Sequence, residues 1–477
     1  MSFANPAFQI PRVSVIGEEP EWAKMFDPRP VGASPTLPEP LAPTNPAPEV
    51  MQAQGLLNVS TPRTWACDLL NGLDIATWDG RKTVHFMAIR GTDIRSPFNG
   101  PQWPGPTIRV PRGVVFHGST RGKGPPPHTI HWHGIEPTSI NDGVGHCSME
   151  IGGFTYQWQP NYIGSYFYHC HRNTMQHFEF GLYGNLFILP PDAYFASVVG
   201  SDWTTQTLPA TITLNNIPVG ACSDGKFRIA ANLAKFPQFP GFIAGDPVFG
   251  VGNATDDGIG DPHAFTVPYD VEVMWVLDDR DSRWSDLASN AFTTFPQFGN
   301  NPGIDDQFNR NPGRASFFAF NDYHADYFYL TGLPFRGHVG DAAPAPLTDP
   351  TTVFPGGTVP AAINSGVSGT QVAVNASVGQ TILIRCLDAA YAGTKVTFPV
   401  DVVIVAWDGR ALGVPPFGLY SEPYLVPANT PVELSTARRC DILIRPVQAM
   451  SSFVNVEFYD TRGDRLLIKA QIPFNIV

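Results

Sequence analysis

The sequence is poor in charged residues and in long apolar runs. Only 15% of its 477 residues are charged, the formal net charge is -12, and lysine and arginine form no cluster. A nucleic-acid-binding surface is therefore not expected. No apolar run reaches the roughly 18 residues that a membrane-spanning helix needs, so no membrane span is expected. The opening residues also lack the charged-then-apolar pattern of a secretory signal peptide.

Cysteine is scarce as well, with six in the whole chain. Cys386 and Cys440 stand in strand-like runs, where they either form a disulfide or remain buried apolar thiols. Cys147 and Cys222 are a second candidate pair. Six cysteines therefore do not identify the compartment in which the protein works.

Proline and glycine, by contrast, are abundant. The chain has 48 Pro, 45 Gly and 12% aromatic residues, a composition typical of short strands joined by turns. We therefore predict an all-β protein, and its length allows two or three domains. Residues 1–50 are so rich in proline that we expect an extended arm.

Seven of the twelve histidines lie in one stretch of sequence, between residues 128 and 184. His131 and His133 are two residues apart, which places both side chains on one face of a strand. His169 and His171 share a face in the same way, and Cys170 between them points to the opposite face. Two ligand sets therefore diverge from one strand.

The residue types in this stretch indicate metal binding. Imidazole suits copper, zinc or iron, and one thiolate with two imidazoles and a weak axial neighbour is the composition of a blue-copper site. Cys170, His128 and His177 fit that composition. The other histidines lack companions and are interpreted as structural or surface residues: His85, His117, His146, His263, His324 and His338.

This stretch resembles the copper-binding motifs of the multicopper oxidases, and residues 103–113 and 142–158 extend the resemblance. The resemblance implies cupredoxin-like Greek-key β-sandwich or barrel domains. It also implies an oxidoreductase that passes electrons from a phenolic or metal-ion donor to oxygen, in the periplasm or outside the cell. The implied type 1 copper ligands are His128, Cys170 and His177, and the implied type 2/type 3 copper ligands are His131, His133, His169 and His171.

Two features depart from the family's pattern. Five residues separate His171 from His177, where the family often has three, so Met175 is a rival type 1 ligand. Leu182 stands where many blue-copper sites have an axial Met, which would leave a copper ion effectively three-coordinate and raise its potential. Leu182 is equally compatible with an ordinary core position.

The copper motifs occur once. We predict a copper-binding domain over residues 51–200 and a second cupredoxin-like domain over 201–477, without copper motifs and with an insertion around 236–311. One chain then supplies half of the histidines of a trinuclear cluster, and a homo-oligomer could supply the rest across a subunit interface. The alternatives are an electron-transfer or structural copper protein, or a nitrite-reductase-like copper enzyme.

Overall fold

The computed structural model describes two blocks of chain and several short segments between them. The N-terminal block comprises residues 63–91, 101–111, 116–123, 128–144, 153–158, 160, 164–171 and 174–189. The C-terminal block comprises residues 266–285, 323–341, 345–347, 372–412 and 423–477. Three short segments, at 213–214, 217–218 and 227–230, lie between the blocks. The predicted arm at 1–50 lies outside the described residues.

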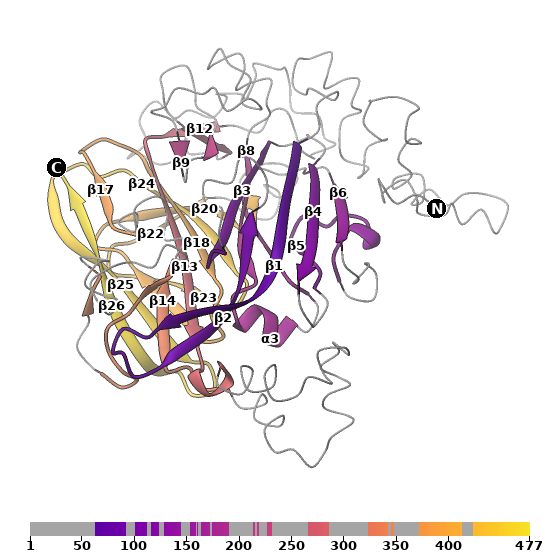
Figure 1. Cartoon of the computed structure of the whole chain (residues 1–477). Helices are drawn as coiled ribbons and strands as arrows, with labels where there is room; N and C mark the ends of the chain where they lie inside the picture. The colour runs from indigo at the N-terminus through magenta and orange to yellow at the C-terminus, as the bar shows by residue number, and fades with distance from the viewer. Residues whose placement is uncertain are drawn as a thin grey trace, which may run out of the picture.

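The N-terminal block consists of two four-stranded sheets, drawn in indigo to magenta in Figure 1. The first has the order β2 (Thr83–Gly91), β1 (Arg63–Ala76), β4 (Phe116–Lys123), β6 (Gly153–Trp158). The second has the order β3 (Gly105–Pro111), β8 (Tyr183–Leu189), β7 (Gly164–His169), β5 (His131–His133). A 3-10 turn, η3 (Ser139–Asn141), and one short helix, α3 (Thr174–Glu179), interrupt the strands. Side chains from both sheets form one buried cluster, so the sheets pack face to face.

The C-terminal block also contains two sheets, in orange and yellow in Figure 1. The eight-stranded sheet has the order β15 (Leu333–Pro334), β14 (Tyr327–Leu330), β13 (Val271–Arg280), β18 (Ile382–Asp388), β24 (Arg439–Ile444), β20 (Val402–Trp407), β21 (Arg410–Ala411), with β22 (Tyr424–Val426) beside β20. The six-stranded sheet has the order β16 (Ala345–Pro346), β26 (Arg465–Ile476), β25 (Met450–Asp460), β19 (Gly393–Thr397), β23 (Pro431–Leu434), with β17 (Val374–Ala376) beside β26. Two further pairs are β9 (Thr213–Leu214) with β10 (Ile217–Pro218), and β11 (Phe227–Ala230) with β12 (Thr266–Tyr269).

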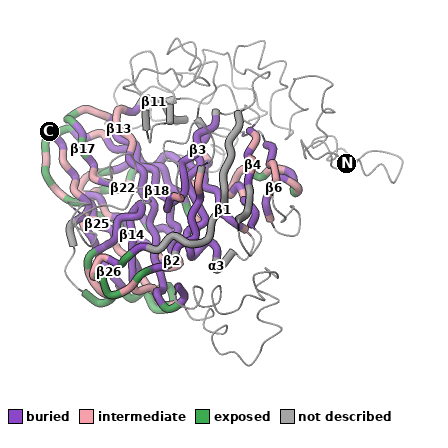
Figure 2. The backbone as a smooth tube through the Cα atoms, viewed as in Figure 1, coloured by how far each residue is buried: buried purple, intermediate pink, exposed green. Residues whose placement is uncertain are grey.

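Burial along the strands follows their place in the sheets. Every residue of β18 is buried, as expected for a central strand that is covered on both faces. In β26, buried and half-buried residues alternate from Ala470 onward, because one face packs on the core and the other faces outward. Figure 2 shows this contrast between a buried interior and a partly exposed outer layer.

The two blocks share a core and a buried ion-pair network. Phe86, Trp103 and Phe167 of the N-terminal block belong to the same hydrophobic cluster as Trp275 of the C-terminal block. Arg109 of β3 forms a bidentate ion pair with Glu272 of β13, with nitrogen–oxygen distances of 3.1 and 3.3 Å. The sites described below are therefore built on one packed body.

The predicted all-β fold class is confirmed. The insertion predicted around 236–311 contains β13, however, which is an interior strand of the eight-stranded sheet. Its near-continuous apolar run is what a core strand requires, so residues 271–280 belong to the domain core. The rest of the domain division stays a prediction.

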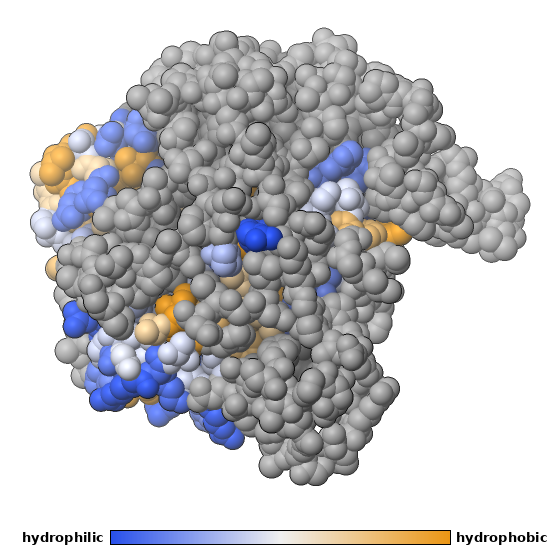
Figure 3. All heavy atoms as spheres, in the orientation of Figure 1, coloured by the Kyte–Doolittle hydropathy of each residue, from blue (hydrophilic) through white to orange (hydrophobic). Residues whose placement is uncertain are grey.

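Among the described residues, no helix is long and apolar enough to cross a bilayer. Figure 3 shows hydrophilic atoms gathered on the lower part of the C-terminal block. The exposed turn between β25 and β26 carries Arg462 and Asp464, and the exposed Arg465 begins β26. This end of the block therefore faces solvent.

Candidate metal centres

The structure brings together His128, Cys170 and His177. The Cys170 Sγ atom lies 3.1 Å from Nδ1 of His177 and 3.6 Å from Nδ1 of His128. The three potential ligand atoms lie within 4.8 Å of one another, and all three residues are buried. One thiol and two imidazole nitrogens that converge in a water-poor environment fit a type 1 copper ion.

Three different elements supply these side chains. His128 precedes β5, Cys170 directly follows β7, and His177 lies on α3. The Cys170 N–H donates to the carbonyl of Leu182, and the Leu182 N–H donates to the carbonyl of His177, at 2.9 and 3.0 Å. Backbone hydrogen bonds therefore return the chain from α3 to the end of β7. The Met175 side chain lies outside the described residues, so its rivalry with His177 stays open.

Leu182 is fully buried in the same hydrophobic cluster as Cys170. The surroundings of the site are accordingly apolar. Burial also lowers the pKa of His128 to about 4, so its imidazole is neutral at neutral pH and retains a lone pair for a metal ion. The axial role of Leu182 stays a prediction.

A second group of histidines lies at the facing ends of β5 and β7. His131 pairs with His169 across the two antiparallel strands, and His133 Nδ1 lies 3.3 Å from His169 Nε2. Ligand atoms of His131, His133 and His169 lie within 4.8 Å of one another. The ring of His171 lies 5.0 Å from that of His131, beside this group. We call these four residues the histidine cluster.

Hydrogen bonds fix how two of these imidazoles present their nitrogens. His131 Nδ1 lies 2.7 Å from the carbonyl oxygen of Asp142, and His169 Nδ1 lies 2.9 Å from that of Cys170. A carbonyl oxygen only accepts, so each Nδ1 carries a proton, and in the neutral ring Nε2 is the nitrogen that can bind a metal ion. Burial, followed by the charge of Arg439 and the neighbouring histidines, lowers the pKa of His133 to about 3. The His133 imidazole is therefore neutral at neutral pH and keeps a lone pair that a metal ion could accept.

The histidine cluster opens into a pocket of about 790 Å³. His131 and His133 line one wall, and Asp408, Arg410 and residues 436–439 of the C-terminal block line the other. Among the described residues that line this pocket, the C-terminal block contributes arginines and no histidine. Arg439 is nearly fully buried, with its guanidinium 5.4 Å from the ring of Phe167, which stacks on His133.

The remaining histidines and cysteines lie apart from both groups where they are described. His324 contacts Arg462, and His338 contacts Asp79 and Trp78. His117 is on β4, the side chain of His85 is outside the described residues, and so are His146 and His263. Cys386 and Cys440 face each other across β18 and β24 as free buried thiols, whereas Cys147 and Cys222 lie outside the described residues.

Two residues near the candidate metal ligands, Arg439 and Glu179, were not predicted from the sequence. Arg439 reaches the histidine cluster from about 270 residues away, through the packing of β24 beside β7. Glu179 is buried at the end of α3, two residues after His177, and contacts β13 and the residue that follows it. A charged residue in an apolar, aromatic segment (HFEFGLYG) was the available signal for Glu179.

Comparison with known proteins shows that both sets of candidate metal ligands lie in one segment that matches a protein family. Residues 91–193 match the family described as multicopper oxidase. This segment is similar to a multicopper oxidase domain. It contains all seven predicted ligands.

Two curated relatives agree with that assignment. An L-ascorbate oxidase from Cucumis sativus is 37% identical over 101 residues, which is 19% of this chain and 16% of the relative. Copper resistance protein A from Pseudomonas syringae pv. tomato is 30% identical over 151 residues, or 30% of this chain and 24% of the relative. The chain thus matches about a quarter or less of these relatives' length.

Solved structures show a broader, weaker similarity. The blue copper oxidase from Nitrosomonas europaea covers 86% of this chain and 86% of its own, at 16% identity and a TM-score of 0.44. The multicopper oxidase mgLAC covers 87% of this chain and 86% of its own, at 16% identity and a TM-score of 0.45.

Proposed function

We propose that the protein is a copper-dependent oxidoreductase of the multicopper oxidase type. The observation that carries the proposal is the convergence of Cys170 with His128 and His177 directly beside the histidine cluster. Copper bound at these residues would supply one-electron redox chemistry, which the side chains do not provide themselves. The proposed type 1 ligands are His128, Cys170 and His177, and the proposed ligands of the type 2/type 3 site are His131, His133, His169 and His171.

The chain links the two sites covalently. Cys170 lies between His169 and His171, so one peptide bond separates a proposed type 1 ligand from a proposed ligand of the other site on each side. The apolar packing around Cys170 excludes water from the first site. The histidine cluster instead opens into the 790 Å³ pocket, where a small reactant can reach it.

We further propose a phenolic or metal-ion electron donor, with oxygen as the acceptor, and a location in the periplasm or outside the cell. The described residues of one chain provide one set of imidazoles at the cluster. A second subunit in a homo-oligomer is therefore proposed to provide the others. The two-domain division at about residue 200 belongs to this proposal.

One observation favours a second candidate function. The pocket wall opposite His131 and His133 carries Arg410, Arg438 and Arg439. Guanidinium groups do not bind metal cations, so this wall supports a cluster with fewer metal ions than a trinuclear site. An electron-transfer copper protein or a nitrite-reductase-like enzyme with one further copper would fit that wall.

The type 1 assignment is tested by replacing Cys170 with Ser. The wild-type protein loaded with Cu(II) should show an intense blue absorption, because a thiolate ligand is present. The variant should lose the colour and keep its far-UV circular dichroism. Cys440→Ser is the matched control, since Cys440 is also a buried free thiol and lies outside both groups. Blue colour retained in the Cys170 variant would refute the assignment.

A further inference from the structure

The helix that carries His177 is too short to hold its own position. α3 has six residues, and isolated helices of that length are unstable in water. Its orientation must come from tertiary contacts. His177 and Glu179 are two residues apart, which corresponds to about 200° around a helix, so their side chains leave it on nearly opposite sides. One side faces Cys170 and the other faces the C-terminal block.

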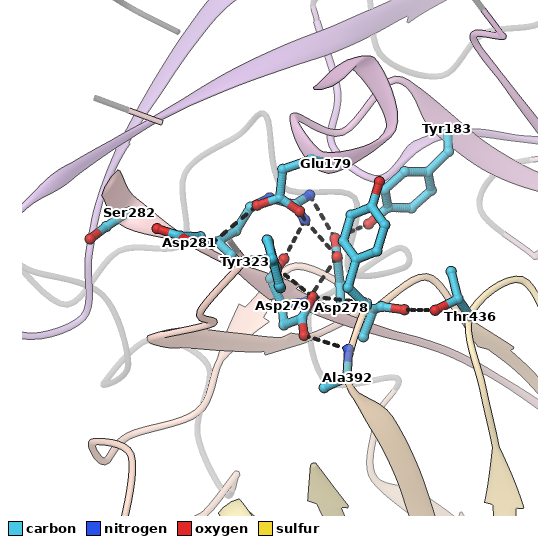
Figure 4. A network of polar contacts seen from close by, with 12 residues as sticks. Glu179, Tyr183, Asp278, Asp279, Asp281, Ser282, Tyr323, Ala392 and Thr436 are labelled. Atoms are coloured by element: carbon cyan, nitrogen blue, oxygen red, sulfur yellow. Dashed lines mark hydrogen bonds and ion pairs between the residues drawn. The ribbon is translucent and has the colours of Figure 1, made fainter. Parts of the chain in front are cut away.

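Glu179 makes the polar contacts on that second side. Its side chain is 1% exposed, and its Oε1 atom accepts a hydrogen bond from the backbone N–H of Asp281 at 3.1 Å. Arg280 Nη1 lies 3.9 Å from its Oε2 atom. Figure 4 shows Glu179 pointing from α3 into this network. The Asp281 N–H therefore fixes Oε1 of Glu179 by a hydrogen bond, and Arg280 adds a longer contact to Oε2.

Arg280, which contacts Glu179, is itself held in place by other side chains. Both Nη atoms of Arg280 bond the carboxylate of Asp278, at 2.6 and 2.7 Å. The guanidinium of Arg280 also lies over the rings of Phe86 and Trp103, at 5.2 and 5.0 Å from their centroids. The end of β13 is therefore a rigid point of attachment.

The segment that follows α3 is anchored to the same strand. The Tyr183 hydroxyl donates to Asp278 (Figure 4). Gly181 has a φ of +102°, and a Cβ atom there would lie 2.4 Å from the indole ring of Trp103. Phe178 packs on Tyr183 at 5.1 Å between ring centroids. Tyr183 thus anchors this segment to the C-terminal block, and Gly181 and Phe178 pack it within the N-terminal block.

We propose that Glu179 is a positioning residue, through which Arg280 and Asp281 hold α3 so that His177 meets Cys170. This inference rests on the proposed type 1 assignment. It gives the C-terminal block a specific part in the copper site, although that block carries no copper motif. Loss of the Asp281 hydrogen bond would let α3 rotate and move the imidazole away from the thiol.

The test compares Glu179→Leu with Glu179→Gln in the full chain. Leucine has a similar size but no acceptor, whereas glutamine keeps an oxygen that can accept the Asp281 N–H. Removal of such outer contacts typically lowers metal affinity about 10- to 100-fold. We expect Glu179→Leu to weaken Cu(II) binding by at least about tenfold and to shift the blue absorption and the copper EPR spectrum. Glu179→Gln should retain both.

A stability control separates positioning from general damage. Val456 is fully buried in the six-stranded sheet, away from α3, so Val456→Ala lowers stability without touching the helix. This variant should keep the wild-type spectrum. If Glu179→Leu does not fold, Glu179→Asp decides instead, because its shorter side chain withdraws the carboxylate from Asp281.

Wild-type Cu(II) affinity and spectrum in Glu179→Leu, or in Glu179→Asp if that variant is used, would overturn the inference. A spectral change of equal size in Val456→Ala would also overturn it. If wild-type protein itself shows no blue copper, the proposed function fails first, and the two failures are thereby distinguished.

Discussion

The carboxylate of Glu272 offers a test of how the two blocks are joined. It is 2% exposed and lies between Arg109 of β3 and Arg385 of β18, each no more than 1% exposed. Glu272→Gln keeps the volume and removes the charge that Arg109 and Arg385 share, and Arg385 then retains only the longer contact with Asp441, at 3.8 Å, as an ion pair. Breaking a buried pair in this way typically costs about 3–5 kcal/mol.

The assay is urea unfolding of the metal-free protein, so that copper binding does not contribute to the free energy of unfolding. Glu457→Gln is the matched control, because Glu457 pairs with Lys469 at 2.9 Å where both side chains are partly exposed. That change should cost less than about 1 kcal/mol. Equal effects of the two substitutions would refute the view that the Glu272 network holds the blocks together.

Burial alone would raise the pKa of Glu272, but its two arginines outweigh burial and hold the pKa below the usual 4.5. The ionised carboxylate should therefore stabilise the folded protein above pH 4.5, and this stabilisation should be lost on acidification. In urea unfolding, the difference in stability between wild type and Glu272→Gln should shrink as the pH falls below 4.5. Gly143→Ala should destabilise the protein, because φ is +77° and the new Cβ would lie 1.7 Å from the Ile130 carbonyl oxygen, and a thermal unfolding midpoint equal to that of wild type would contradict this. His177→Ala should abolish the blue absorption and Met175→Ala should retain it, because His177 contacts the thiol; the opposite result would make Met175 the ligand.

Local geometry in the sequence predicted that each His-x-His pair shares one strand face, whereas the grouping of the two pairs was implied by the family resemblance. Alternation along a strand is a property of the backbone, so the shared face of His131 and His133 followed from their spacing. Their register with β7 did not, because pairing across strands depends on the whole sheet. The structure supplies it by placing His131 opposite His169.

Contacts between segments that are distant in the chain could not be predicted from the sequence. Arg439 meets the histidine cluster because β24 packs beside β7, and Glu179 meets Asp281 because α3 packs on the end of β13. Neither contact leaves a periodic signal, since each depends on how two sheets pack. β13 itself was assigned to an insertion because its flanking residues are rich in glycine, proline and asparagine, although its own apolar run is a core strand.

In the proposed enzyme, one chain holds a type 1 copper site beside a histidine cluster that reduces oxygen when subunits associate. The most direct measurement is copper content per chain, taken with molecular mass in solution and oxygen consumption with a phenolic donor. We expect more than one copper per chain, a blue absorption, an oligomer and oxygen uptake. A monomer with a single blue copper per chain and no oxygen uptake would contradict the proposed function.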